Sequence, residues 1–478
     1  MAGSEVVVVD LGAANVRACI ASTSSRFEPL SVPNLSAKAK GKKAVAIADQ
    51  VIQLPDVSSV VIRRPHDRGY LVNVDLESQI LDRVFKEKLK IKSTKGGSLL
   101  CSEPLFALPS IQHMLNELVF EKFEFERFLP LPAPFLTAYG QSHLPAWGST
   151  KPPETFSFSG ANSMMSDIES HSLAKEAQCG IVVDAGYSFT HAVPFLGLQI
   201  LMPGVKRLDF GGKAMTNLLK EVVSYRSINM MDETYIIDDV KERLCFVAQN
   251  IDVEAHEAKK GMNSSLYREY VLPDGVKLTR GHVRDVSKTK SQAGAGSDDD
   301  DDVAPSSASE EEQYIPLCNE RFMIPEVLFQ PSDIGIEQAG VAEIVTQAVR
   351  LYLMYFAFTH GTSSMSLILS FDDFLHYLDD QVESLSSSPS TYGILYSNII
   401  LSGGCTTIPG FVERFNKDLR SIVPSDFDVH VSVPHDPQGC ALAGGYAYAS
   451  SKYFETTAFF RAQYFEEGPD RMMRRMRL

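Results

Sequence analysis

The sequence predicts an α/β protein of two lobes, and three features lead to this fold class. The chain has 478 residues, which is more than one hydrophobic core usually serves and indicates about three domains or two large lobes. Apolar runs that end in glycine-bearing turns predict buried strands of an α/β sheet. Segments with apolar residues at helical spacing alternate with these runs along the chain.

The first predicted strand is a run of four valines at residues 6–9, which continues into Asp10 and Gly12. Consecutive valines cannot alternate between a buried and an exposed face, so we expect a strand buried on both sides. A carboxylate at the end of such a strand can hold a hydrated magnesium ion, while backbone N–H groups of the turn contact phosphate. A single Asp-x-Gly sequence is also typical of a simple hairpin turn, so this first copy leaves both interpretations open.

Further strands and helices are predicted in the middle of the chain. Residues 108–123 and 211–225 carry apolar side chains at helical intervals. Residues 179–194 and 396–410 are apolar runs that end in glycine-bearing turns, as expected for buried strands.

A second strand with the same ending strengthens the phosphate-loop interpretation. IVVDAG at residues 181–186 repeats the pattern of VVVDLG at residues 7–12 and sets Asp184 where the first copy has Asp10. Two such loops can face one another across a cleft and clamp phosphates from both sides, with the carboxylates sharing a hydrated Mg²⁺. A repeated motif therefore favours a phosphate site over two unrelated turns.

Composition and charge exclude several classes of protein. No apolar run approaches the roughly 20 residues needed to span a bilayer, and the N-terminus lacks a basic region, so neither a membrane protein nor a secreted one is expected. The seven cysteines are odd in number and widely spread, which favours free thiols in a reducing compartment over a zinc site. The net charge of −15 argues against the usual nucleic-acid-binding surface, so contact with an acidic polymer should be indirect or through basic proteins.

Two segments have the composition of insertions, residues 141–177 and 286–313. The first is rich in Ser, Pro and Gly, and the second carries five consecutive aspartates and then three glutamates. Such stretches cannot bury enough apolar area to offset their ordering entropy, so both are expected to be disordered. The acidic segment is either a solvated spacer or a site that attracts basic tails such as those of histones.

Several longer motifs resemble a known family. IILSGGCTTIPGF at residues 399–411, VKERLCFV at residues 240–247, interpreted as a helix start, and YVLPDG followed by NERFMIPEVLFQPSDIGI closely resemble actin and the actin-related proteins. The resemblance covers most of the chain outside the insertions. RRPHDRGYL, VFEKFEFERF, SYRSINMMDET, HVSVPHDP and YFEEGPDR resemble the sixth subfamily of actin-related proteins, which is nuclear.

This resemblance implies the fold shared by actin, hexokinase and heat-shock-chaperone ATPases, with two duplicated lobes, each built on a mixed five-stranded sheet, around a nucleotide cleft. Residues 1–140 and 432–478 are then expected to form the first lobe and residues 178–431 the second. A third insertion, residues 360–392, is longer than the family pattern requires. Within it, residues 371–385 carry apolar side chains on one side of a helix, which either binds a partner or folds back onto its own lobe.

The resemblance also assigns a nucleotide site for ATP or ADP with magnesium. It places Asp10, Gly12 and Arg17 on the first phosphate loop, Asp184 and Gly186 on the second, Lys241 and Glu242 beside adenine and ribose, and Gly403 and Gly404 against the nucleoside. Asp10 and Asp184 are expected to hold Mg through water. The alternative for Lys241 and Glu242 is a solvated helix face. His191 matches a histidine near the attacking water in actin.

The cleft departs from actin at groups that hydrolysis needs. Ala13 and Ala14 replace a serine and a glycine, which removes a hydroxyl that contacts the γ-phosphate. Ala133 replaces a glutamine that orients the attacking water, and such a group makes a main contribution to phosphoryl transfer. Other departures are Arg17 for a lysine, Tyr187 and Ser188 for an Asp-Gly pair, and Ile408 and Gln438 for a tyrosine and a lysine that contact the base. We expect a site that holds nucleotide but hydrolyses it poorly.

The subfamily resemblance implies a non-catalytic structural subunit of a nuclear Swr-type chromatin-remodelling complex, which deposits histone variant Z and regulates transcription. The expected partners are the Swr/SRCAP-type motor subunit, a zinc-finger HIT protein and the nucleosome, with no membrane and no filament. The alternatives are an active ATPase or kinase and a filament-forming actin, since this fold hosts all three. No unassigned residue offers a kinase base, and the insertions together with the loss of actin similarity in residues 22–62 disfavour repeating filament contacts. The nucleotide state and the contacts of the insertions stay open.

Overall fold

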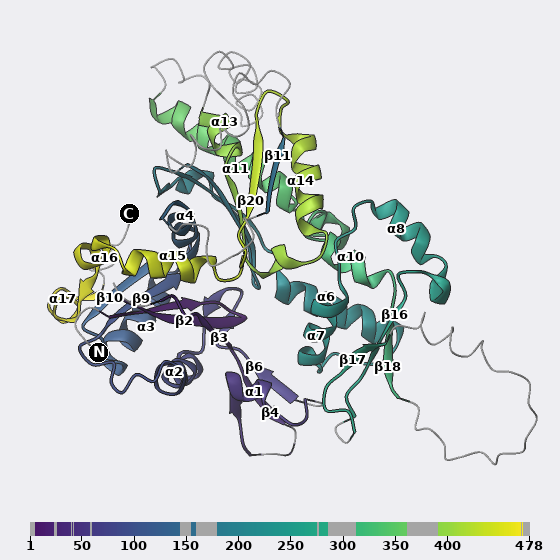
Figure 1. Cartoon of the computed structure of the whole chain (residues 1–478), viewed down its shortest axis with the longest axis horizontal. Coiled ribbons are helices and arrows are strands. Elements are labelled where there is room, and N and C mark those ends of the chain that lie inside the picture. The colour runs from purple at the N-terminus through teal and green to yellow at the C-terminus, as the bar shows by residue number, and fades with distance from the viewer. Residues whose placement is uncertain are drawn as a thin grey trace, which may run out of the picture.

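The computed structural model describes residues 5–22, 26–39, 41, 43–57, 60–143, 154–158, 179–274, 277–284, 312–360, 391–469 and 471. Most of the three predicted insertions therefore lies outside the described residues, including the acidic run and the predicted helix at residues 371–385. The described part forms two α/β lobes, one built on the purple and blue strands with the yellow C-terminal helices, the other on the teal and green elements (Figure 1).

The first lobe is built on a six-stranded sheet with strand order β21-β10-β9-β1-β2-β3. Its strands are β1 (Val6–Leu11), β2 (Asn15–Ala21), β3 (Leu30–Pro33), β9 (Ser98–Glu103), β10 (Arg127–Pro132) and β21 (Phe459–Phe460). The strands β1, β9 and β10 are parallel neighbours, whereas β2, β3 and β21 pair antiparallel with theirs.

The second lobe repeats this topology in a seven-stranded sheet. Its strands are β11 (Glu154–Phe158), β20 (Val429–Val433), β19 (Ile399–Ser402), β12 (Gly180–Ala185), β13 (Thr190–Leu196), β14 (Gln199–Ile200) and β15 (Lys206–Leu208). Here β12, β19 and β20 are the parallel neighbours, and β13 pairs antiparallel with β12. The two lobes are therefore duplicates, which confirms the predicted fold class.

The sheets differ from the prediction at their edges. Among the described residues, both sheets have more strands than the five that were predicted. The predicted boundary between the lobes, at residues 431–432, falls within β20, which belongs to the sheet of the second lobe. Strand β11 comes from within residues 141–177, so the expectation of disorder is wrong for residues 154–158. The physical reason is that the edge of β20 offers unpaired N–H and C=O groups, with which a short passing segment can pair.

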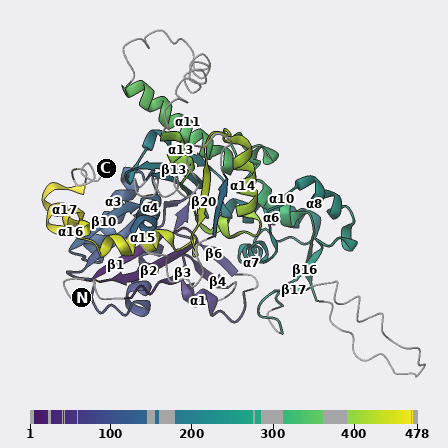
Figure 2. The same ribbon diagram turned by 45° about the horizontal axis from the view of Figure 1, so that its top comes forward.

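The valine run lies in the middle of the first sheet, buried on both faces as predicted. Val7 and Val9 pack into a core with α2 (Val74–Arg83), while Val6 and Val8 pack into a core with α4 (Ala133–His143) and α15 (Cys440–Ala449). Figure 2 shows α15 lying across this sheet. The predicted helix at residues 108–123 forms as α3 (Pro109–Glu117), which continues in the π-helical turn η2 (Leu118–Lys122).

Helices α4 and α15 cross closely at the base of the two lobes. A side chain at Gly444 would place its Cβ 1.7 Å from the carbonyl oxygen of Leu136, so only glycine fits there. Ala138 of α4 packs in turn against Val182 and Ile400 of the second sheet. Helix α4 therefore contacts the sheets of both lobes and connects them.

The remaining elements complete the two lobes. The predicted helix at residues 211–225 forms as α6 (Gly212–Arg226). Among the residues that the structure describes, the second lobe also contains the helices α7 (Thr234–Leu244), α8 (Ile251–Ala258), α10 (Glu320–Glu326), α11 (Val341–His360), α13 (Thr391–Tyr396) and α14 (Phe411–Ile422). Beside them lies a small sheet of β16 (Arg268–Val271), β17 (His282–Arg284) and β18 (Tyr314–Leu317). In the first lobe a small subdomain consists of α1 (Asp49–Ile52), β4 (Ser36–Ala39), β5 (Ala46–Ile47), β6 (Val60–Arg63), β7 (His66–Asp67) and β8 (Tyr70–Leu71). The last helices of the described residues are α16 (Lys452–Thr457) and α17 (Arg461–Glu467).

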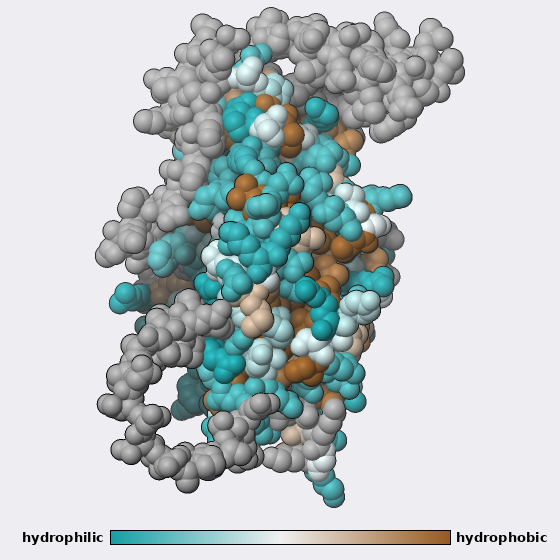
Figure 3. Space-filling view, turned by 90° about the vertical axis from the view of Figure 1, so that its right-hand side faces the viewer, coloured by the Kyte–Doolittle hydropathy of each residue, from teal (hydrophilic) through white to brown (hydrophobic). Residues whose placement is uncertain are grey.

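The outer face of the second lobe mixes hydrophobic and hydrophilic side chains (Figure 3). Exposed apolar residues there include Val253 of α8 and Met323 of α10. Single exposed apolar residues of this kind are usual on protein surfaces. None of the helices in the described part of the chain combines the length and apolar character needed to cross a bilayer.

Candidate functional site

A cavity of about 540 Å³ lies between the lobes, where β1 and β12 end. Its size is that of a small-molecule site, for which roughly 300–1,000 Å³ is usual. All nine residues of the predicted nucleotide site line it, namely Asp10, Gly12, Arg17, Asp184, Gly186, Lys241, Glu242, Gly403 and Gly404. The structure thus brings together residues up to 394 positions apart in the chain.

Asp10 is positioned by two strands beside its own. It is paired with Arg17 across the β1–β2 ladder, and an Arg17 nitrogen lies 3.6 Å from the carboxylate. From β9, the Ser102 hydroxyl donates a hydrogen bond of 2.6 Å to Asp10 and accepts one of 2.9 Å from the Leu11 N–H. Sequence reasoning missed Ser102, because only the parallel register of β1 and β9 brings it to this carboxylate.

Asp184 occupies the same place in the second lobe as Asp10 does in the first. Each aspartate is the fifth residue of its six-residue strand. Burial, and after it the negative charge of Asp10, raise the pKa of Asp184 to about 6, while the positive charge of Arg17 opposes this shift. A buried carboxylate repelled by a second carboxylate is a suitable donor set for a divalent cation, which would offset that repulsion.

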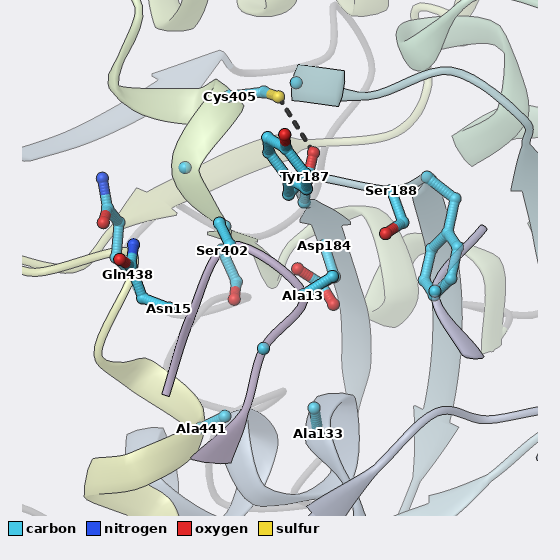
Figure 4. A pocket seen from close by; sticks show the side chains of 18 of the residues that line it. Ala13, Asn15, Ala133, Asp184, Tyr187, Ser188, Ser402, Cys405, Gln438 and Ala441 are labelled. Atoms are coloured by element: carbon cyan, nitrogen blue, oxygen red, sulfur yellow. Dashed lines mark hydrogen bonds between the residues drawn. The ribbon is translucent and has the colours of Figure 1, made fainter. Parts of the chain in front are cut away.

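The glycines of the cleft allow close approach of its walls. A Cβ at Gly12 would lie 2.6 Å from the carbonyl oxygen of Asn15. The loop at residues 11–15 between β1 and β2, here called the first loop, therefore turns too tightly for a side chain at this position. Gly403 has φ +93°, and a Cβ there would lie 2.3 Å from the carbonyl oxygen of Ala185. The carbonyl of Gly186 accepts hydrogen bonds from the Gly212 N–H and from the Cys405 thiol, the latter drawn in Figure 4.

Lys241 and Glu242 lie in the last turn of α7, so the interpretation of VKERLCFV as a helix start is wrong. Lys241 is buried, which also excludes a solvated helix face for that residue. Its ammonium group donates to Asp238, to the Thr216 hydroxyl at 2.9 Å and to the Gly212 carbonyl at 3.2 Å. An ammonium has three protons, so the protein itself satisfies all of them and leaves the hydrocarbon stem to border a ligand.

The residues that the sequence analysis placed near the γ-phosphate and the attacking water include two alanines and a histidine. Ala13 and Ala133 present only methyl groups in Figure 4. His191 also lines the cleft, and its Nε2 is buried with no hydrogen-bond partner among the described residues. Burial, reinforced by Arg207, lowers the pKa of His191 to about 3, so the imidazole is neutral. A buried polar atom without a partner among the described residues, at the wall of the cavity, fits a site that admits water or a polar ligand.

The chain is similar throughout its length to known proteins. The family model described as Actin matches residues 1–477. Actin-related protein 6 of Oryza sativa subsp. japonica is 34% identical over 488 residues, covering 99% of each chain, and that of Arabidopsis thaliana is 35% identical over 482 residues, again covering 99% of each. Actin-related protein 6 of Drosophila melanogaster is 30% identical over 467 residues and 97% of each chain.

Proposed function

The chain belongs to the actin family, and we propose that it is a non-catalytic structural subunit of a nuclear Swr-type chromatin-remodelling complex that deposits histone variant Z. In this proposal it supports complex assembly, nucleosome binding and transcription regulation. The observation that carries the proposal is the full-length similarity to proteins named actin-related protein 6, which agrees with the subfamily motifs of the sequence.

The proposed partners are a Swr/SRCAP-type motor subunit and a zinc-finger HIT protein, with histones and DNA contacted mainly through the complex. Affinity purification of the chain from its native source, followed by identification of bound subunits, tests this assignment. We expect both partners to be recovered in amounts comparable with the chain. Recovery of only a free monomer or a filament would overturn the proposal.

We further propose that ATP or ADP with magnesium binds in the cleft as a structural ligand. Asp10 and Asp184 are the residues that would hold the hydrated ion, and Gly12 and Gly186 are those that would border the phosphates. The raised pKa of Asp184 supports this, because a cation bound between the two carboxylates would offset the repulsion from Asp10 that contributes to the shift. A ligand that contacts both lobes stabilises the folded state by mass action.

Thermal unfolding of the full chain with and without Mg·ATP tests the ligand. We expect a higher melting temperature with Mg·ATP, and a smaller rise for Asp184→Ala. The matched control is Asp82→Ala, which removes an exposed carboxylate on α2. An equal rise for Asp184→Ala and the wild type would exclude this site.

Ala13 and Ala133 support a non-hydrolysing role, since neither offers a group to grip the γ-phosphate or to orient water. The motor subunit then supplies the energy of histone exchange. We expect the purified chain to turn over ATP more slowly than about one per second, the lower end of usual enzyme rates. Faster turnover that Asp184→Ala abolishes would favour the alternative, an active actin-fold ATPase.

A further inference from the structure

The segment of residues 64–70 in the small subdomain of the first lobe reaches across to the second lobe. Arg64 follows β6 and lies at the centre of these contacts. On its own side its Nη1 donates to the carbonyl oxygens of Ala13 at 3.3 Å, Ala14 at 3.0 Å and Asn34 at 3.5 Å. The guanidinium therefore holds the first loop of the cleft by its backbone.

On the far side the same guanidinium faces two groups of the second lobe. Its Nη2 lies 3.8 Å from Asp238 of α7, and its carbon lies 4.6 Å from the centre of the Tyr187 ring. Asp238 in turn holds the Lys241 ammonium, so the contact reaches the end of α7 that lines the cleft. Tyr187 also packs against Gly212, where an added Cβ would lie 3.2 Å from the ring.

Neighbouring residues make parallel contacts between the lobes. These are an ion pair of 2.6 Å between Lys213 and Asp67, a hydrogen bond of 3.2 Å from Arg207 to the Tyr70 hydroxyl, and close packing of Gly69 against the Phe189 ring. A Cβ at Gly69, which has φ +82°, would lie 2.0 Å from that ring. The two lobes are thus in direct contact beside the cleft, with no ligand needed to connect them.

We propose that Arg64 is an interlobe clamp, a positioning residue that ties the first loop to α7 and holds the two walls of the cleft together with protein atoms alone. A guanidinium suits this role because its planar fork can donate in several directions while its face stacks on an aromatic ring. The clamp goes beyond the proposed function, since it acts whether or not a nucleotide binds. It also keeps the loop at residues 11–15 in the shape that a phosphate group would need.

Hydrogen–deuterium exchange of the full chain without nucleotide tests the clamp. For Arg64→Ala we expect about tenfold faster amide exchange in both residues 11–15 and residues 234–244. The reason is that both segments lose contacts to a hydrogen-bonded charged group, so each should open locally more often. Arg63→Ala is the matched control, because Arg63 is the adjacent arginine and is exposed. Amides of β9 and β10 serve as an internal reference, since global destabilisation would speed their exchange equally.

The outcomes separate the clamp from a local role. Faster exchange confined to residues 11–15 would mean that Arg64 supports only its own lobe and would overturn the proposal, as would equal effects of Arg63→Ala. If Arg64→Ala does not fold, Arg64→Lys is measured instead, because a lysine keeps the charge but cannot donate to the carbonyls and stack on Tyr187 together. Exchange of Arg64→Lys at the wild-type rate would equally overturn the clamp. Because no nucleotide is present, none of these results depends on the proposed ligand.

Discussion

Replacing Glu77 by glutamine probes how the first loop is supported from behind. Glu77 lies on α2 and is fully buried. Its Oε2 accepts a hydrogen bond of 3.2 Å from the amide of Asn34 and lies 3.5 Å from His66 Nδ1, while its Oε1 has no partner among the described residues. The same Asn34 amide donates at 3.0 Å to the carbonyl of Gly12. The cluster therefore links a buried acid to the turn of the first loop.

The pKa of Glu77 determines the expected magnitude. Burial raises this pKa from an ordinary value of 4.5 to about 7, against the lowering effect of the Asn34 hydrogen bond. The folded state then binds the proton more tightly than the unfolded state, so this contribution to stability is complete below about pH 4.5 and is lost as the pH rises through about 7. The shift corresponds to roughly 3 kcal/mol. Glutamine cannot ionise, so Glu77→Gln should be more stable than the wild type at pH 8 by up to that amount.

Urea unfolding followed by circular dichroism at pH 5 to 8 measures this effect. Burial lowers the pKa of nearby His66 to about 4, which adds stability as the pH rises, but both proteins share this contribution and the difference between them isolates Glu77. The control is Glu117→Gln, an exposed glutamate on α3. If Glu77→Gln proved less stable than the wild type at pH 8, Glu77 would be a stabilising anion and the reasoning would be wrong.

Two further predictions concern the cleft and its base. Since burial and Asp10 raise the pKa of Asp184 to about 6, its carboxylate is mostly protonated at pH 5, and the affinity for Mg·ATP in a thermal-shift titration should fall about tenfold between pH 7 and pH 5. In Asp184→Asn the affinity for Mg·ATP should no longer change in this way with pH. If the affinity of this variant still fell about tenfold between pH 7 and pH 5, Asp184 would not be the titrating group. Gly444→Ala should destabilise the chain by roughly 1–3 kcal/mol in urea unfolding, because its Cβ would collide with the Leu136 carbonyl. Gly393→Ala, whose Cβ would meet its nearest neighbour at 3.6 Å, is the control and should change little.

Much of the fold followed from local patterns in the sequence. The valine run predicted a strand buried on both faces, and the structure places Val7 and Val9 in one core and Val8 in another. The helical spacing of residues 211–225 predicted α6, and the two Asp-x-Gly sequences predicted two equivalent strand ends. These features are readable because strand and helix periodicity directly reflects which face of an element is buried.

The resemblance read from the sequence placed nine residues in one site, and all nine line the cavity, but tertiary structure decided other contacts that the sequence analysis did not predict. Ser102 reaches Asp10 only through the register of parallel strands, and Arg64 reaches Asp238 only because the lobes face one another. The Lys241 ammonium donates hydrogen bonds to acceptors on two helices, α6 and α7. The spacing of residues along one helix does not predict contacts of this kind. Strand β11 formed in a segment whose composition predicted disorder, because the edge of a distant strand was available for pairing. Such contacts depend on packing between elements far apart in the chain, and local composition and periodicity carry no record of them.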